Sequence, residues 1–212
     1  MPRRPPTSPR KKPRQQRSQA TVDCILDATA RVLCSTGYDR ASTNRIALAA
    51  GVSVGSLYQY FPSKEALVAG LAERHTAAMT SLIKEKLAEV ASQPLDAAIR
   101  TVIQAMFDAH AVDPKLHKVL IEEVPRVGKL QQVVRVEREV EAMVIALLEA
   151  RRKDLRRTKL GATSFVLCHV VEAVTHAAVL FELEEPRRSE VAAELTDLLL
   201  RYLPASQSPA LY

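Results

Sequence analysis

The feature that most constrains the fold of this chain is the stretch of residues 43–64, TNRIALAAGVSVGSLYQYFPSK. A short helix pattern over residues 44–50 meets Gly51, and a second pattern over residues 54–60 ends before Pro62. Two brief helices joined by a turn of a few residues that contains glycine form a helix-turn-helix. The pattern alone leaves open whether this motif binds DNA or is simply two packed helices.

The second helix of the motif has two faces of different chemistry. At about 100° per residue, Leu57 and Phe61 fall on one side, which suits a protein core. The other side carries Ser56, Gln59 and Tyr60, which are uncharged and can hydrogen-bond to base edges and phosphates. We therefore expect one face to hold the helix to the protein and the other to contact a partner.

Gly55 lies inside this second helix, where glycine costs about 1 kcal/mol relative to alanine. Close approach of the backbone to a partner is one reason for a glycine at such a position. The alternative is that Gly55 only helps the helix to begin, with Ser53 as its N-cap.

The positive charge of the chain is concentrated at its beginning. The net charge is +6, yet residues 1–22 contain seven basic groups and no acidic one, so the remainder is near neutral. Residues 1–16 are rich in proline and arginine and nearly free of apolar side chains, which predicts a disordered basic arm. Such an arm can neutralise DNA phosphates and make binding depend on salt, and a solubilising tail is the alternative.

Other features indicate a cytoplasmic protein without membrane contact. No apolar stretch follows the basic beginning, and no run of 18 apolar residues is present, so neither a secretory signal nor a membrane span is expected. The three cysteines, Cys24, Cys34 and Cys168, lack CxxC spacing, which favours free thiols in a reducing compartment. We expect them to be small buried side chains.

Helical periodicity runs through the rest of the chain. From Ser18, apolar side chains recur at helical spacing until Gly37, which is suited to end a helix. Ser42 or Thr43 can cap the first helix of the motif, and Ser63 can cap the helix after it. Further helices are expected at residues 66–90, 97–111, 115–124, 130–152, 159–183 and 191–202. Because no segment alternates with period two, the chain is predicted to be all-α.

The boundary between two domains is expected inside the long fourth helix. Residues 17–77 would contain three helices and the start of the fourth, and residues 78–212 would form a second helical domain. A continuous helix across a boundary can transmit a rotation, which a flexible linker cannot.

One later helix is apolar on nearly every side, at residues 165–171, FVLCHVV. A helix of this kind is buried on several faces, and in a small domain it can face the core and a second subunit at once. Together with the last helix, at residues 191–202, it is predicted to form a homodimer interface. Burial within a single chain is the alternative.

Three polar residues, His169, Glu172 and His176, lie within about 60° of one another on this apolar helix. Polar groups in such a place are costly unless paired, so they could orient a polar ligand or bind a metal ion. The alternative is that they satisfy one another or a neighbouring helix. Other side chains could line the same effector pocket, with core packing as the alternative for the apolar ones: Met106, His110, Met143 and Phe165. We assign no cofactor and no metal site.

The sequence TNRIALAAGVSVGSLYQYFPSKEAL, at residues 43–67, resembles the N-terminal signature of the TetR family of transcriptional regulators. The resemblance implies a homodimeric repressor whose two recognition helices enter successive major grooves of a pseudo-palindromic operator in double-stranded DNA. A small-molecule effector would tilt the fourth helix and separate the two DNA-binding heads. Residues 17–77 would then be the DNA-binding domain, and residues 78–212 the effector-binding and dimerisation domain.

The resemblance also implies roles for single residues. Thr43 and Lys64 would each bind a phosphate, and Tyr58 would contact the DNA backbone. Leu57 and Phe61 would belong to the core. The remaining positions would touch phosphate or base, or face the major groove: Asn44, Arg45, Ser53, Val54, Gly55, Ser56, Gln59 and Tyr60.

The chemistry of the second helix favours contacts to A·T base pairs. Gln59 can bond adenine at N6 and N7, and Val54 can touch a thymine methyl group. The helix contains no arginine or lysine, so Arg45 is the nearest candidate for a guanine contact.

Three other functions compete with that of a repressor. An enzyme is disfavoured because the chain contains no HExxH, GxGxxG, P-loop or GxSxG pattern. A non-specific architectural DNA-binding protein is compatible with the basic arm but not favoured by the polar outer face of the helix. An activator, or a regulator of the same fold without an effector, is the alternative within the family.

Overall fold

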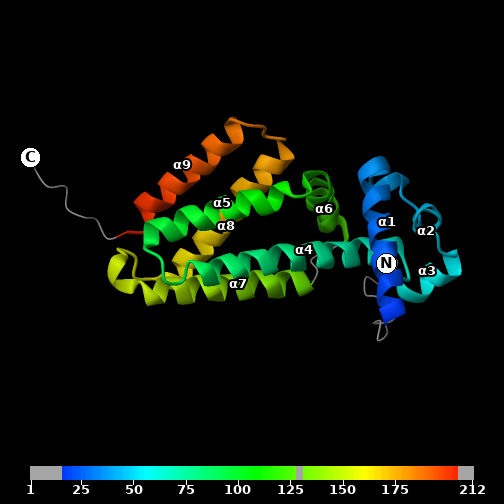
Figure 1. The fold of residues 1–212 in the computed structure, drawn as a ribbon, viewed down its shortest axis with the longest axis horizontal. Helices are drawn as coiled ribbons and strands as arrows, with labels where there is room; N and C mark the ends of the chain where they lie inside the picture. The colour runs from blue at the N-terminus through cyan, green and yellow to red at the C-terminus, as the bar shows by residue number, and fades with distance from the viewer. Residues whose placement is uncertain (1–15, 128–130, 205–212) are drawn as a thin grey trace, which may run out of the picture. The chain divides into compact units, whose positions relative to one another are not determined.

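The computed structural model describes residues 16–127 and 131–204. Within these ranges, helices are joined by loops, and the only β-structure is an isolated bridge between Leu155 and Pro204 (Figure 1). The helices are α1 (Gln16–Arg40), α2 (Thr43–Ala50), α3 (Val54–Tyr60), α4 (Lys64–Glu89), α5 (Leu95–Ala111), α6 (Pro114–Val127), α7 (Gln131–Ala150), the 3₁₀ helix η1 (Arg152–Asp154), α8 (Leu160–Leu180) and α9 (Arg187–Tyr202). The prediction of an all-α fold is confirmed. The predicted disordered arm lies outside the described residues, apart from Gln16, where α1 begins.

The chain divides into two compact units. The first, Met1–Ala77 with Lys115–Val134, contains α1, α2, α3, the first part of α4 and most of α6. The second, Ala78–Pro114 with Arg135–Tyr212, contains the rest of α4 and α5, α8, α9 and most of α7. The division falls inside α4, and it groups α6 with the N-terminal helices, which the sequence pattern did not predict.

Short polar side chains and a glycine set the helix ends of the first unit. Ser42 and Ser53 cap α2 and α3, because each side-chain oxygen accepts a hydrogen bond from an amide in the first turn. Ser63 caps α4 in the same way. Gly51 ends α2 with φ at 66°, a left-handed conformation that glycine adopts without a steric cost. The two helices of the motif therefore lie within one residue of the predicted positions.

A single hydrophobic core holds the first unit together. Leu57 of α3 and Phe61 directly after α3 are almost completely buried in it. Gly70 of α4 lies against Phe61, and a Cβ at that position would come within 2.9 Å of the ring. The absence of a side chain thus lets α4 approach the end of α3 closely. Buried residues from the other helices of the unit complete this core: Ile25, Leu33, Ile46, Leu116 and Leu120.

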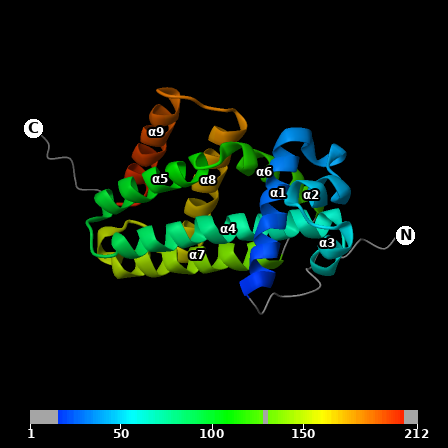
Figure 2. The same cartoon turned by 45° about the vertical axis from the view of Figure 1, so that its right-hand side comes forward.

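In the second unit, α5, α8 and α9 pack against one another. Phe107 of α5, Leu167 of α8 and Leu195 of α9 are buried in the shared core. The second part of α4 runs alongside α7 in both views (Figures 1 and 2), and Lys84 Nζ lies 2.7 Å from Glu139 Oε2 between them.

Arg151, which follows α7, fixes the C-terminal end of α4. Its guanidinium is buried, and Nη2 lies 2.7–2.8 Å from the carbonyl oxygens of Val90, Ala91 and Gln93. These carbonyls belong to the turn that directly follows α4. A buried cation therefore satisfies carbonyls of the turn that follows the helix shared by the two units.

The expectation that the cysteines are buried is wrong. Cys24 and Cys34 are exposed and Cys168 is half-buried, although none forms a disulfide. Cys24 lies at the surface of α1, where its thiol donates a hydrogen bond to the carbonyl of Ala50 at 3.3 Å. For Cys168, burial raises the pKa of the thiol, which disfavours the reactive thiolate.

Among the described residues, α8 is the one helix whose length and composition would allow it to cross a membrane. It has 21 residues and a mean hydropathy of 1.5 over its most apolar window. The core helices of soluble proteins pass the same test.

Candidate nucleic-acid interface

The helix α3 presents a polar outer face from a firmly held position. Leu57 is fully buried, and Phe61 is 2% exposed. Beside this buried pair Val54 is 37% exposed and Tyr58 is 41% exposed, and Gln59, on the opposite side of the helix, is also exposed. The predicted burial of Leu57 and Phe61 is confirmed, whereas of the three residues predicted on the outer face only Gln59 is exposed.

The outer face of α2 continues this surface. Asn44 and Arg45 are exposed, and Thr43 at the start of the helix is half-buried. Arg45 turns towards the end of α1, where its Nη1 donates to the Arg40 carbonyl at 3.3 Å. Sequence reasoning missed Leu48, which is 83% exposed, although its spacing of four from Asn44 places both on one helix face.

Thr43 and Tyr58 are brought together by the packing of α2 against α3. Their hydroxyl oxygens lie 3.1 Å apart and share a hydrogen bond. Each hydroxyl has one proton, so one proton serves this bond and the other is available for a further acceptor. The pair can therefore hold an anionic oxygen such as that of a phosphate, and the sequence had not predicted that the two residues meet.

Three of the predicted groove-facing residues are engaged within the protein. Ser53 Oγ caps α3 and lies 2.8 Å from Ser56 Oγ, and Ser56 is half-buried. The Tyr60 ring is also half-buried, because it packs against the core of the first unit. These three side chains are therefore less available to contact a partner than the Gln59 side chain.

Lys64, the first residue of α4, is positioned by Tyr38. Its ammonium donates to the Tyr38 carbonyl at 2.9 Å and lies 3.9 Å from the centre of the Tyr38 ring, a cation–π contact. The Tyr38 hydroxyl in turn lies 3.3 Å from Glu65 Oε1. Burial acts to raise the pKa of Glu65, but hydrogen bonds from its own amide, Ser63 and Tyr38 and the charge of Lys64 hold it below its ordinary value. Sequence reasoning missed Tyr38, which lies 26 residues before Lys64.

Gly55 lies on the exposed side of α3. A Cβ built at this position would meet no atom closer than Ser53 Oγ, at 3.9 Å. Packing within the protein therefore does not require a glycine here, and the bare backbone of Gly55 is open to an approaching partner.

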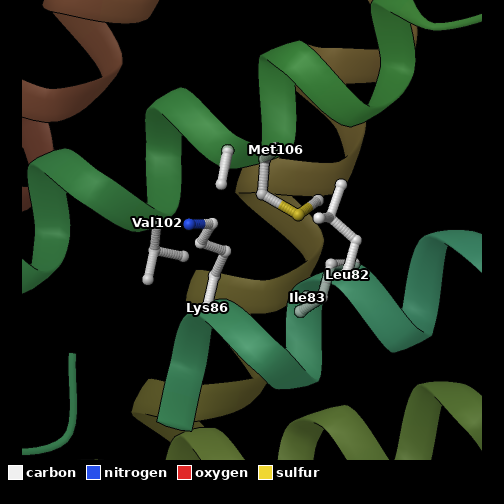
Figure 3. Close-up of a pocket in the computed structure, with 6 residues that line it drawn as sticks. Leu82, Ile83, Lys86, Val102 and Met106 are labelled. Carbon is white, nitrogen blue, oxygen red and sulfur yellow. The ribbon is translucent and has the colours of Figure 1, made fainter. Parts of the chain in front are cut away.

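The second unit contains a groove between α4 and α5. Figure 3 shows three α4 side chains, Leu82, Ile83 and Lys86, opposite side chains of α5. Of the residues predicted to bind an effector, Met106 lines this groove. The other predicted residues lie elsewhere in the unit: His110, Met143, Phe165, His169, Glu172 and His176.

His110 is buried and satisfied by its own surroundings. Its Nδ1 donates to the Met106 carbonyl at 2.7 Å, and its Nε2 lies 3.5 Å from Thr175 Oγ1. The His176 ring lies 5.3 Å from the His110 ring between centres, and burial lowers the pKa of His176. These contacts favour a structural role for both rings, and the lowered pKa favours the neutral form of His176.

The remaining residues of the predicted effector set do not converge on one site. His169 is exposed, and its ring stacks on that of Phe165, with centres 4.0 Å apart. Glu172 and Met143 are half-buried. Phe165 itself is 53% exposed, so it faces outward rather than into a pocket of the second unit.

Two family models match the chain. Residues 25–71 match the model described as bacterial regulatory proteins, tetR family. Residues 94–203, about half of the chain, match the model described as tetracyclin repressor-like, C-terminal domain.

Curated relatives and solved structures agree with these matches. The chain is 29% identical over 110 residues to the nucleoid occlusion factor SlmA of Glaesserella parasuis, which covers 52% of each protein. It is 24% identical over 186 residues to the HTH-type transcriptional regulator BetI of Cronobacter sakazakii, covering 87% of this chain and 91% of that one. The structure of SmeT, the repressor of a multidrug efflux pump of Stenotrophomonas maltophilia, matches with a TM-score of 0.63 at 22% identity. The match covers 92% of this chain and 99% of the SmeT chain. The chain spans about half the length of the nucleoid occlusion factors that it matches.

Proposed function

The chain belongs to the TetR family of DNA-binding transcriptional regulators, and from this premise we propose that it is a homodimeric repressor that a small molecule releases from a pseudo-palindromic operator. The observation that carries the proposal is the set of exposed side chains on α3, Val54, Tyr58 and Gln59, on a helix that the buried Leu57 holds to the core. SmeT, which has the same fold, is a repressor by its description.

We assign the contacts of this surface by their chemistry. The hydroxyl pair of Thr43 and Tyr58 and the ammonium of Lys64 bind phosphates, which positions the protein on the duplex. Gln59 accepts and donates at adenine, and Val54 contacts a thymine methyl group. Arg45 is the candidate for a contact to guanine.

Dimerisation is proposed through the outer face of α8 together with α9. Phe165 and Val166 of α8 are 53% and 43% exposed, and Leu198 of α9 is 55% exposed. Exposed apolar side chains gathered on neighbouring helices mark protein interaction surfaces. A twofold-symmetric pair of such surfaces would place two copies of α3 on two half-sites of the operator.

Effector control is proposed to act through α4. This helix begins with Lys64 in the first unit and continues after Ala77 into the second. A ligand that moves the second part of α4 would therefore also move the residue that binds a DNA phosphate.

Selection of binding sites from random DNA by the purified full-length protein tests the proposal. We expect a pseudo-palindrome with half-site centres about one helical turn, or a multiple of it, apart. Light scattering of the free protein is expected to give the mass of a dimer. Equal affinity for random and selected DNA at physiological salt would contradict sequence-specific repression and favour a non-specific DNA-binding protein.

A further inference from the structure

The segment between α7 and α8 carries a local excess of positive charge. Residues 151–159, RRKDLRRTK, contain six basic side chains and one acidic one. The chain after residue 22 is near neutral overall, so the excess is a property of this segment. Arg151 is buried against carbonyl oxygens, and we call the remaining residues, 152–159, the basic segment. Four of its basic side chains are exposed and the last is half-buried: Arg152, Lys153, Arg156 and Lys159, and then Arg157.

Two arginines of the basic segment converge on one backbone oxygen. The Nε groups of Arg156 and Arg157 donate to the Tyr202 carbonyl at 2.9 and 3.1 Å. The Arg157 guanidinium also lies over the Tyr202 ring, 3.9 Å from its centre. The bridge between Leu155 and Pro204 holds the segment beside the end of α9 as well (Figure 1). Two positive charges are therefore kept side by side by a neutral acceptor.

The shared carbonyl engages only part of the hydrogen-bonding capacity of this pair. A guanidinium has five N–H donors, and the Nε donor of each arginine is bonded to Tyr202. Among the side chains that the structure describes, no carboxylate forms an ion pair with Arg156 or Arg157, whereas Arg188 of the same unit pairs with Glu185. The Nη groups of the pair can therefore donate to an anion that approaches from solvent.

The apolar side chains at this place are turned inward. Leu155, and Leu160 directly after the segment, are 8% and 4% exposed. A helix that lies on a membrane buries an apolar face, and a tight protein interface is centred on apolar or aromatic anchors. The basic segment presents cations and N–H donors instead, and the planar guanidinium group matches the oxygens of a phosphate. Its chemistry therefore favours the backbone of a nucleic acid.

We propose that the basic segment is a second DNA-binding surface, which contacts the phosphates of duplex DNA without reading their sequence. It belongs to the second unit, whereas α3 belongs to the first. The inference goes beyond the proposed function, which assigns DNA contacts to the first unit alone. Each phosphate that the segment neutralises releases counterions, so the contact adds affinity for any sequence and weakens as salt rises.

Removal of the two converging charges tests the proposal in the full-length protein. Arg156→Gln together with Arg157→Gln keeps polar side chains and removes both charges. We expect the affinity for a random-sequence duplex to fall about tenfold, and the slope of log affinity against log salt to decrease by about two for each protomer. Fluorescence anisotropy titrations at several salt concentrations measure both. An unchanged slope in the folded double variant would overturn the proposal.

The matched control is Arg187→Gln together with Arg188→Gln at the start of α9. These are also one exposed and one half-buried arginine, adjacent in sequence, so the loss of net charge is the same. Arg188 already pairs with Glu185, which makes it a poorer partner for phosphate. We expect the salt slope of this control to equal that of the original protein. An equal decrease in both double variants would show an effect of net charge alone and would overturn the basic segment as a contact.

A second variant does not depend on the arginines that bond to Tyr202, and it decides the question if their replacement unfolds the protein. Lys153→Gln together with Lys159→Gln removes two exposed charges, and we expect the salt slope to decrease in the same direction. A photoreactive benzoylphenylalanine in place of Lys153 is expected to cross-link to the duplex, and one in place of Arg187 is not. An unchanged slope in the lysine variant, or no cross-link from position 153, would overturn the proposal.

Vesicles of anionic phospholipid distinguish the phosphate of DNA from that of a lipid headgroup. We expect the original protein and the Arg156→Gln, Arg157→Gln variant to bind equally little to phosphatidylglycerol vesicles in a sedimentation assay. Vesicle binding that is lost in this variant, with an unchanged salt slope for DNA, would overturn the proposal in favour of a lipid surface.

Selection of binding sites separates this inference from the proposed function. The Arg156→Gln, Arg157→Gln variant is expected to select the same operator as the original protein, because phosphate contacts carry no sequence information. A different selected sequence would overturn the proposal. Failure of the original protein to select any operator would instead contradict the proposed function, and the salt slope on random DNA would still test the basic segment.

Discussion

The outer faces of α3 and α8 are both exposed, but they differ in chemistry. On α3 the exposed residues include Tyr58 and Gln59, whose polar groups can hydrogen-bond to a partner. On α8 they include Phe165 and Val166, which are apolar. A hydrogen-bonding face beside groups proposed to bind phosphate suits the edges of bases, whereas an apolar face suits a second protein surface. Exposure alone therefore does not identify the kind of partner, whereas the side-chain chemistry of the exposed face does.

The strongest test of this comparison is to charge the apolar face. Phe165→Asp places a carboxylate in the proposed dimer interface, where it would be desolvated without a partner. A monomer binds one half-site only, so we expect operator affinity to fall by about 10²-fold or more through the loss of the second contact. Light scattering gives the mass, and fluorescence anisotropy gives the affinity.

Phe181→Asp is the matched control for that change. Phe181 directly follows α8 and is 78% exposed, and at about 100° per residue it lies far around the helix from Phe165. We expect this variant to remain a dimer with the original operator affinity. A dimer formed by Phe165→Asp would show that the outer face of α8 is not the interface.

The polar face of α3 is tested by Gln59→Ala. A side chain that bonds adenine at two positions provides about 1–3 kcal/mol of discrimination, so the preference at one base pair of each half-site should be lost. Binding selection with the variant measures this directly. Gln104→Ala, which alters an exposed glutamine of α5 bonded to Asp108, is the control and should leave the selected sequence unchanged. Retention of every base preference by Gln59→Ala would remove this residue from the contact set.

Lys64→Ala should act on all DNA sequences alike. Loss of one phosphate contact is expected to weaken specific and random DNA equally and to reduce the slope of log affinity against log salt by about one for each protomer. Tyr38→Leu, which removes the ring beneath the ammonium, should cause a smaller loss in the same direction. Anisotropy titrations at several salt concentrations measure both. A changed sequence preference in Lys64→Ala would show that the lysine contacts a base.

Local patterns in the sequence were sufficient to predict the helix-turn-helix. The caps Ser42 and Ser53 and the left-handed Gly51 depend on residues a few positions away, so they can be recognised without the fold. The burial of Leu57 and Phe61 likewise follows from helix periodicity alone.

Contacts between distant residues could not be predicted in this way. Tyr38 and Lys64 lie 26 residues apart, and nothing in either segment indicates that the ring supports the ammonium. For α8, an apolar pattern on all sides predicts burial, but it does not say which side the same chain covers. The exposed Phe165 and the buried Thr175 both lie on this helix, and the packing of α5 and α9 decides between them.

The smallest effect, and the one that separates folding from binding, is expected from Gly55→Ala. The added methyl group meets no atom of the protein closer than 3.9 Å, so the helix should gain up to about 1 kcal/mol of stability from the higher propensity of alanine. If DNA approaches this backbone, the same methyl group should weaken operator binding. Gly51→Ala is the matched control, because its φ of 66° strains any residue with a Cβ and should lower the free energy of unfolding. Chemical denaturation measures the stability of both variants, and operator titration measures their DNA affinity. Only Gly55→Ala is expected to gain stability while it loses affinity. A gain in stability with unchanged operator affinity would mean that DNA does not approach Gly55 and that this glycine only belongs to the start of α3.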